Sequence, residues 1–182
     1  MDAEARGPRI AVIGGGITGA MAARHMASAC VVHVYDQGRR GPGGRASHRA
    51  VCADTRAVLP DDPPIAPGAL EFDHGCQFTR ADDERMRHLV SDWIARGWAA
   101  EWRGRFGAVG KDGTAVDFFG LPDHSDPVYC GVGGMHTLPR SILADSAATV
   151  HRGVRVAGMH RETDGTWTLL GVGGAAAYHD TA

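Results

Sequence analysis

The chain has 182 residues, of which 43% are hydrophobic and 22% charged, so it can bury one core of ordinary size and a small appendage. Its 19 basic and 21 acidic residues give a net charge of −2 without runs of one sign, so nucleic acid and anionic membrane surfaces are not expected partners. The cysteines lack C-x-x-C spacing, the first residues do not resemble a secretory leader, and every apolar stretch is broken before the about 20 residues of a membrane span. We therefore expect a cytoplasmic protein.

The first 36 residues predict a β-α-β unit. Residues 9–13 are a β-branched apolar run, residues 14–19 a glycine-rich turn, and residues 20–29 an alanine- and methionine-rich helix. Residues 31–36 form a second apolar run that ends in an acid. Strands joined in this way pair in parallel with a right-handed crossover, so we expect an α/β fold built on a parallel sheet.

A long surface excursion is expected next. The prolines and glycines of residues 37–68 argue against a regular helix or a central strand there. A short strand follows at 69–73, and apolar residues at helical spacing then predict a helix around residues 86–94. Thr79 or Asp82 is the expected N-cap of that helix.

The second half of the chain predicts two hairpins and a helix. Segments 99–109 and 114–119 flank turn-forming residues and predict a hairpin that extends from the sheet domain. Apolar residues at helical spacing predict a helix over 135–143. The segments on either side of Asp164 and Gly165 predict two strands joined by a two-residue turn.

A G-x-G-x-x-G pattern at Gly14, Gly16 and Gly19 opens the first helix, and Asp36 closes the next strand. Gly14 permits the tight turn, Gly16 lets the backbone approach a pyrophosphate, and Gly19 permits close packing of helix on strand. The phosphates then lie at the helix N-terminus, beside Thr18, and Asp36 accepts the ribose hydroxyls and repels a 2′-phosphate. The pattern therefore favours a dinucleotide other than an NADP-type nucleotide. The alternative is a glycine-rich turn that binds nothing.

A second glycine-rich motif follows. Asp36 with Gly43, Gly44 and Arg45 resembles the acid and G-G-R motif of the flavin amine oxidase and renalase superfamily. Two glycines bring backbone N–H groups to the diphosphate and ribityl chain, and Arg45 supplies a fixed cation. The alternative is a flexible solvated loop.

Two later segments extend this resemblance. Residues 72–80 are similar to the superfamily segment beside the flavin, which implies that Gln77 and Phe78 line the isoalloxazine ring. The alternative is an ordinary strand end with a core phenylalanine. Residues 150–169 resemble the superfamily's third sheet strand and crossover hairpin, which implies that the backbone of Val156 contacts adenine. Alternatively, Val156 is simply a core residue.

The resemblance runs from residue 9 to about residue 170 and implies a Rossmann-like FAD/NAD(P)-binding domain over 1–182. The domain has a parallel sheet, a crossover β-hairpin and an inserted helix-plus-hairpin excursion, with 79–130 as a partial insertion toward the substrate side. Superfamily members continue beyond this point, so we expect an incomplete domain: a fragment, a truncated gene model or a reduced protein. An uncovered sheet edge would favour self-association.

The resemblance implies an FAD-dependent oxidoreductase that passes a hydride from a small amine or dihydronicotinamide to flavin N5, with reoxidation by oxygen or another acceptor. Two alternatives stay open: a non-catalytic dinucleotide-binding fragment that needs missing segments or a partner, and an NAD-dependent reductase. The histidines lack paired metal-ligand spacing, so no metal is expected. We expect Cys30, Cys76 and Cys130 to be small buried hydrophobes, and no catalytic residue stands out.

Overall fold

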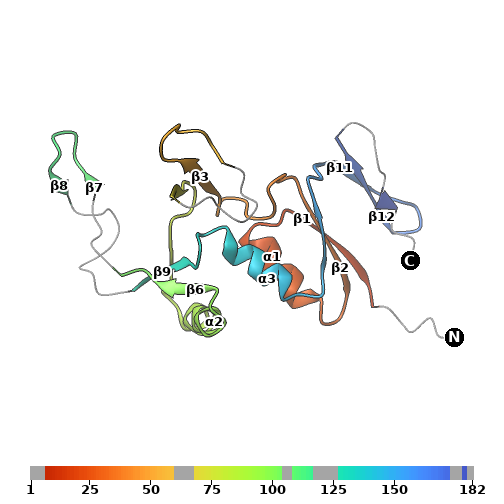
Figure 1. Ribbon diagram of the computed structural model, residues 1–182. Helices are drawn as coiled ribbons and strands as arrows, with labels where there is room; N and C mark the ends of the chain where they lie inside the picture. Colours follow the sequence, from red (N-terminus) through yellow and green to blue (C-terminus); the bar gives the residue numbers. More distant parts are fainter. Residues whose placement is uncertain (1–6, 60–67, 104–107, 117–126, 173–177, 180–182) are drawn as a thin grey trace.

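The computed structural model describes residues 7–59, 68–103, 108–116, 127–172 and 178–179, and its fold is mixed α/β and Rossmann-like (Figure 1). Its centre is a parallel sheet in the order β1-β2-β10, with β1 at Arg9–Ile13, β2 at Val31–Asp36 and β10 at Thr149–Arg152. Helix α1, Ile17–Met26, joins β1 to β2. The predicted parallel β-α-β unit is therefore confirmed.

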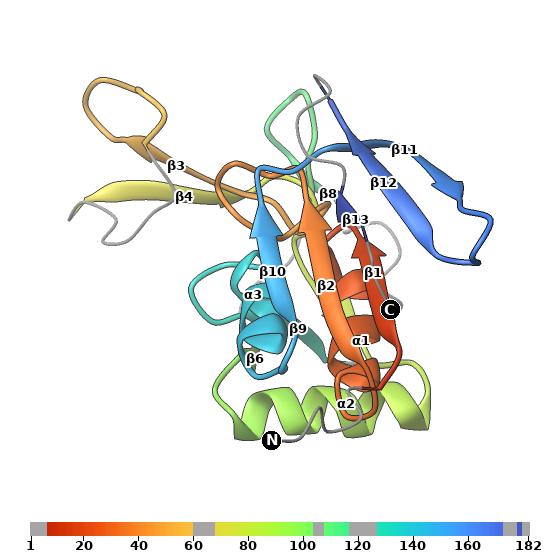
Figure 2. The ribbon, with the colours of Figure 1, turned by 90° about the vertical axis from the view of Figure 1, so that its right-hand side faces the viewer.

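Two helices cover one face of this sheet. Helix α3, Thr137–Ala144, lies beside α1 in the view of Figure 2 and in that of Figure 1. Val32 and Val34 of β2 are buried in the same core cluster as Ala20 and Ala23 of α1, whose small side chains let the helix lie close to the sheet. Burial of this apolar surface is the main stabilising contribution to the unit.

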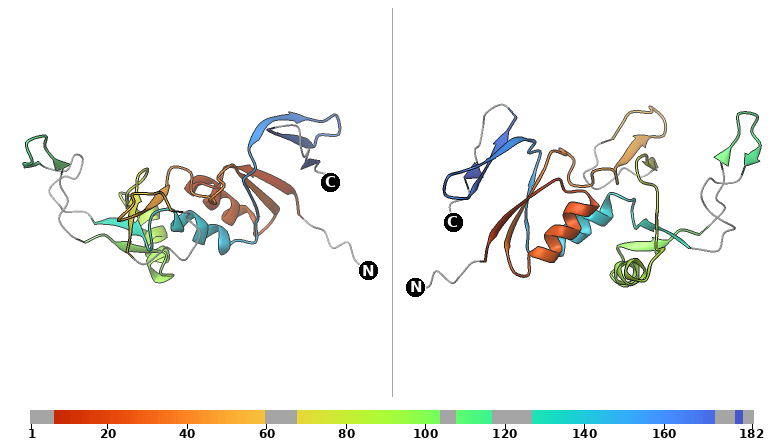
Figure 3. Two further views of the ribbon diagram at one scale, coloured as in Figure 1. Left: turned by 45° about the horizontal axis from the view of Figure 1, so that its top comes forward. Right: turned by 180° about the vertical axis from the view of Figure 1, so that it is seen from behind.

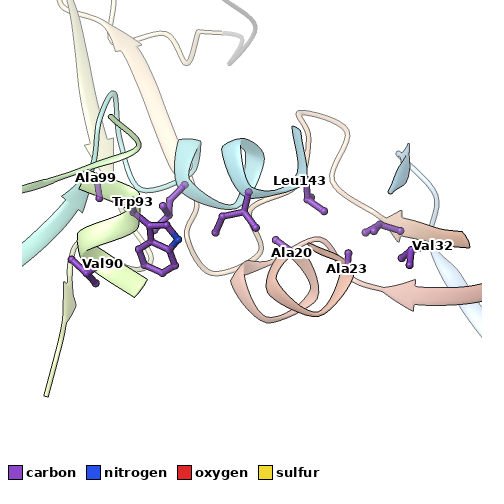
Figure 4. Packing of buried hydrophobic residues seen from close by; sticks show 10 residues of the cluster. Ala20, Ala23, Val32, Val90, Trp93, Ala99 and Leu143 are labelled. Carbon is purple, nitrogen blue, oxygen red and sulfur yellow. The ribbon is translucent and has the colours of Figure 1, made fainter. Parts of the chain in front are cut away.

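The core continues from α3 to the third helix. Helix α2, Glu84–Ala95, places Val90 and Trp93 in the same buried cluster as Leu143 of α3 (Figure 4). Ile94, the last residue of the apolar pattern, is exposed. The N-cap of α2 is Asp83, whose Oδ1 accepts the Met86 N–H at 2.8 Å, so neither of the expected caps is used.

Aromatic rings cover the other face of the parallel sheet. His33 and Tyr35 of β2 alternate with the buried valines and therefore point away from the helices. His151 of β10 stacks on Tyr35 with ring centroids 4.7 Å apart, and its Nε2 lies 3.0 Å from Nδ1 of His33. The sheet thus separates an aliphatic face from an aromatic one.

Antiparallel strands form the outer parts of the molecule, which is elongated (Figure 3). The prediction that residues 37–68 lack regular structure is wrong at β3, His48–Cys52, which pairs with β4, Ala69–Asp73. Residues 48–52 contain no proline or glycine and alternate in burial. The prediction relied on the proline- and glycine-rich loops on either side, whose composition says nothing about these five residues. Residues 60–67 lie outside the described part of the chain.

The first predicted hairpin is shorter than expected. Only β7, Ala108–Val109, pairs with β8, Ala115–Val116, while residues 117–119 lie outside the described ranges. Strand β6, Ala99–Glu101, pairs with β9, Val128–Gly131, which also pairs with β5, Thr79–Arg80. A contact between distant segments therefore replaces the local pairing predicted for residues 99–101.

The second hairpin is confirmed as β11, Val156–Arg161, and β12, Trp167–Gly171, with β13, Tyr178–His179, beside β12. Its turn is one residue longer than predicted, because the Glu162 N–H donates to the Thr166 carbonyl at 2.9 Å across three residues. Gly165 has φ of +90° and takes the left-handed position of that loop.

Candidate functional site

The first glycine-rich turn joins β1 to α1. Gly14 has φ of +98°, a backbone conformation that favours glycine, and its N–H donates to the Tyr35 carbonyl at 2.8 Å. A Cβ at Gly19 would overlap the carbonyl oxygen of Gly14, so only glycine lets the helix lie this close to the strand end. These two roles agree with those predicted from the sequence.

The N-terminus of α1 is suited to an anion. Its N-cap is Gly16, no side chain caps it among the described residues, and its first turn carries no acidic residue. Backbone N–H groups at a helix start have no partner within the helix and form its positive end. A phosphate group placed there would accept hydrogen bonds from the first turn, which includes Thr18.

Asp36 connects the two glycine-rich segments. Asp36 is 6% exposed and lies at the end of β2. Oδ2 accepts the Gly15 N–H at 2.7 Å, and Oδ1 accepts the Gly38 N–H at 2.8 Å. Because a carboxylate offers about four acceptor positions, it can hold both loops and still accept the hydroxyls of a ribose.

The second glycine-rich segment lies directly against the first. Gly44 has φ of +57°, and a Cβ at this residue would lie 3.2 Å from the Gly16 Cα. A Cβ at Gly16 would meet the Gly43 carbonyl oxygen and the Gly44 Cα, each at 3.7 Å. The two loops therefore contact each other through backbone, at the start of α1.

Arg140 of α3 is far from the second segment in sequence but contacts it in the fold. This role was not predicted from the sequence. The Arg140 Nε donates to the Pro42 carbonyl at 3.3 Å, and a guanidinium NH2 group donates to the Arg40 carbonyl at 2.7 Å. These contacts join residues 98 and 100 positions apart. An arginine within an amphipathic helix gives no sequence signal for such a role.

A cavity of about 400 Å³ lies beside this segment. The residues that line it are those at 36–44 and 46–48, with His74, His136 and Arg140. Asp36 and Gly44 are the predicted site residues among them, and Gly16 contacts Gly44 directly. The cavity is within the size range of small-molecule sites.

Eight of the ten predicted site residues lie outside the lining of this cavity: Gly14, Gly16, Thr18 and Gly19 at the start of α1, and Arg45, Gln77, Phe78 and Val156. Arg45 has an exposed side chain, and its carbonyl accepts the Cys76 N–H at 2.8 Å. Gln77 is exposed, and the half-buried Phe78 has its ring centroid 6.4 Å from that of Trp102. Val156 is half-buried at the start of β11. Their assignment to the cofactor stays a prediction.

The cysteines differ from expectation. Cys30, Cys76 and Cys130 are free and only partly buried, so they are not fully buried core residues. Burial nevertheless raises the pKa of the Cys130 thiol, while hydrogen bonds from Thr55 and Asp54 lower the pKa of the Cys52 thiol. None of the four lines the cavity.

Residues 12–93 match the family of NAD(P)-binding Rossmann-like domains. This match covers the first glycine-rich turn, the acid at the end of β2 and the second glycine-rich segment.

Several solved structures are similar to most of this chain at low identity. They include the Diels-Alderase PyrE3 of pyrroindomycin biosynthesis (13% identity, TM-score 0.47, covering 92% of this chain and 30% of that chain). PqsL from Pseudomonas aeruginosa, a probable FAD-dependent monooxygenase, has 12% identity and a TM-score of 0.44, with 93% of this chain and 39% of that chain covered. Aklavinone-11 hydroxylase, in a complex with FAD and aklavinone, has 13% identity and a TM-score of 0.49, with coverage of 93% and 30%. This chain thus spans 30 to 39% of the length of these proteins.

Within the described ranges, no helix is both long enough and apolar enough to cross a bilayer.

Proposed function

We propose that this chain is the FAD-binding part of a flavin-dependent oxidoreductase. The observation that carries the proposal is the backbone contact between Gly16 and Gly44, beside the uncapped start of α1. A domain that binds only NAD needs the first glycine-rich turn, but it has no evident use for a second one held against it. Two such segments suit a longer dinucleotide, whose diphosphate would lie along both.

The residues present fit FAD. Asp36 would hold the ribose of the adenosine half, and the N–H groups at the start of α1 would hold the diphosphate. Gly43 and Gly44 would present backbone N–H groups, while the arginines of the second segment and Arg140 give that side of the cavity positive charge. When bound, the isoalloxazine ring supplies two-electron redox chemistry, and the chain contributes binding, orientation and exclusion of water.

The finer assignment follows the sequence motifs. The G-G-R motif at Gly43, Gly44 and Arg45, with Gln77, supports a member of the renalase and amine oxidase group that acts on a small amine or dihydronicotinamide. Gln77 and Phe78 would then lie beside the ring. In this proposal the protein is cytoplasmic, and an uncovered sheet edge would favour self-association.

The decisive experiment is cofactor identification. The purified chain should have the yellow colour and visible absorption of oxidised flavin, and denaturation should release FAD identified by chromatography. If the preparation is colourless, FAD and NAD should be titrated separately into it, with FAD the tighter ligand. A protein that binds NAD and ignores FAD would contradict the proposal and favour a reductase.

A matched pair of variants would link binding to this site. Gly16→Val places a branched side chain where the loops and the pyrophosphate approach each other, so we expect near-complete loss of FAD binding. Val172→Ala alters an exposed residue after β12 and should bind like the wild type. Equal affinity in both variants would place the cofactor elsewhere.

A further inference from the structure

Three side chains with metal-ligating atoms meet beside the cavity. His48 begins β3, Asp73 ends β4 as its register partner, and His136 is the N-cap of α3. One ligand atom from each lies within 4.8 Å of the other two. The three residues come from separate segments, which explains why no metal-ligand spacing was visible in the sequence.

His48 is a buried histidine without a hydrogen bond. Its side chain is 2% exposed, and neither ring nitrogen has a hydrogen-bond partner in the described part of the chain. Its Nδ1 lies 3.4 Å from Oδ1 of Asp73 without forming a hydrogen bond. A neutral imidazole has one nitrogen with a free lone pair. Because burying it without a partner costs free energy, this nitrogen favours a ligand that takes the lone pair.

The spacing of the donor atoms suits a metal. Ligands at about 2.1 Å from a tetrahedral metal lie about 3.4 Å from each other. The Nδ1 of His48 and Oδ1 of Asp73 already have that separation. The Nδ1 atoms of His48 and His136 both lie beside Gly134, because a Cβ built there would be 2.9 Å from the first and 3.0 Å from the second. A side chain at this residue would crowd both nitrogens, and glycine avoids that.

The surroundings hold one of the three ligands, the Asp73 carboxylate, in place. Both carboxylate oxygens of Asp73 lie 3.0 Å from the Met135 N–H, which fixes the carboxylate next to His136. The His48 and His136 rings stack with centroids 4.3 Å apart, so the His136 ring must rotate to direct its lone pair toward the other two ligand atoms. The hydrogen bonds that hold the Asp73 carboxylate in place strengthen metal binding.

We propose that His48, Asp73 and His136 bind a divalent transition metal, with Zn²⁺ as the preferred ion. Two imidazoles and one carboxylate are a common donor set for zinc with an open fourth position. His48 and His136 also line the cavity, so water or a small ligand can reach that position. The site does not depend on the proposed flavin.

Zinc binding to the whole purified chain tests this proposal. After chelator treatment, titration with Zn²⁺ against a chromophoric zinc indicator should show one tight site per chain. Co²⁺ should occupy the same site and give the visible absorption of low-coordinate cobalt, which Zn²⁺ then abolishes. His48→Gln and His136→Gln should each lower the zinc affinity at least about tenfold.

Two control variants distinguish this site from other histidines. His74→Ala changes a residue that lines the same cavity outside the trio, and His151→Ala breaks the His33–His151 pair on the other face of the sheet. Both should keep the wild-type affinity and the cobalt spectrum. Loss of binding in His151→Ala with retention in His48→Gln would overturn the proposal.

A stability measurement covers the case in which a variant folds poorly. Zinc that binds the folded chain raises its unfolding temperature. At one fixed zinc concentration, that rise should be the same in the wild type and in His74→Ala but clearly smaller in His48→Gln. An equal rise in all three, or no saturable binding to the wild type, would contradict the site.

Discussion

The two glycine-rich segments of the candidate site are held in different ways. The turn at residues 14–19 depends on neighbours: Gly14 and Gly19 fit against each other, and the Gly14 N–H bonds to the adjacent strand. The second segment, residues 37–44, is held by a residue far along the chain, since Arg140 of α3 donates hydrogen bonds to two of its carbonyls. The first segment is therefore specified locally, whereas the second is specified by the folded molecule.

The two segments differ in how far the amino-acid sequence alone determines their conformation. A turn whose geometry follows from its own glycines can be predicted from spacing. A loop whose position follows from an arginine about a hundred residues away needs the packing of α3 on α1 to be known first. The following substitutions test this contrast, in order of decreasing expected effect.

Gly19→Ala should cause the largest effect. Its Cβ would overlap the Gly14 carbonyl oxygen, a backbone atom that cannot move without displacing the turn. We expect a loss of unfolding free energy of about 3 kcal/mol or more, measured by urea denaturation.

Gly16→Ala is the matched control for that variant. Its Cβ would make only ordinary contacts, at 3.7 Å, with the second segment, and its φ of −70° suits alanine. The unfolding free energy of Gly16→Ala should therefore stay close to that of the wild type, far above that of Gly19→Ala. Similar stabilities in the two variants would show that the first turn is not locally constrained.

Asp36→Ala should have the next largest effect, because it removes the group that bonds to both segments. We expect FAD binding to weaken by about 1–3 kcal/mol through lost charge-assisted hydrogen bonds, measured by fluorescence titration. Asp36→Asn keeps one oxygen acceptor and should lose less. An unchanged affinity in Asp36→Ala would refute the ribose assignment.

Arg140→Met should affect the second segment alone. Loss of the hydrogen bonds to the Arg40 and Pro42 carbonyls should loosen residues 37–44 and weaken FAD binding by about 1–2 kcal/mol. Amide hydrogen exchange should rise in that segment and stay unchanged at residues 14–19.

Arg24→Met is the control for Arg140→Met. Arg24 of α1 bonds instead to Asp145, with Nε and Oδ2 3.2 Å apart, and its side chain is partly exposed. It should leave both FAD affinity and exchange in residues 37–44 unchanged. If Arg24→Met had the same effect as Arg140→Met, the second segment would depend on general stability and not on Arg140.

Much of the fold was predictable from the sequence, and the reasons are local. The β-α-β unit follows from apolar runs around a glycine turn, and Val90 and Trp93 follow from helical spacing. The pairing of β6 with β9 was missed because it joins segments about thirty residues apart through backbone hydrogen bonds. Strand β3 was missed because the loops before and after it are rich in proline and glycine, and this composition hid a short strand between them.

The candidate site divides in the same way. The spacing of Gly14, Gly19 and Asp36 predicted a turn and a strand end that the structure contains. Arg140 and the His48, Asp73 and His136 cluster gave no signal, because each contact joins residues far apart in the chain. Side chains brought together by tertiary packing are visible only in the folded molecule.

The smallest expected effect is a change in the pKa of one aspartate in a turn. Two turns share the sequence Asp-Gly-Thr, at residues 112–114 and 164–166, and their hydrogen bonds are entirely local. Asp164 accepts the Thr166 hydroxyl at 2.6 Å and its N–H at 2.9 Å, and Asp112 accepts the Thr114 hydroxyl and N–H at 2.6 and 3.0 Å. In each turn, the hydrogen bond from the threonine hydroxyl to the aspartate is the main reason why the pKa of that carboxyl is below its ordinary value. Stability from a lowered carboxyl pKa is fully present above the unfolded pKa and is lost as the pH falls through the folded pKa, so these turns weaken only in strong acid.

Thr166→Val tests whether such a turn is truly local. It removes the hydroxyl donor but keeps the backbone N–H, so the pKa of Asp164 should rise partway toward its ordinary value. The carboxyl carbon shifts of Asp164 and Asp112, followed by NMR as the pH is lowered, measure both groups in one sample. Asp112 should titrate as in the wild type, because its own threonine is intact. An unchanged Asp164 would show that the hydroxyl is not the cause, and a parallel change in Asp112 would show that the two hairpins are coupled through the rest of the molecule.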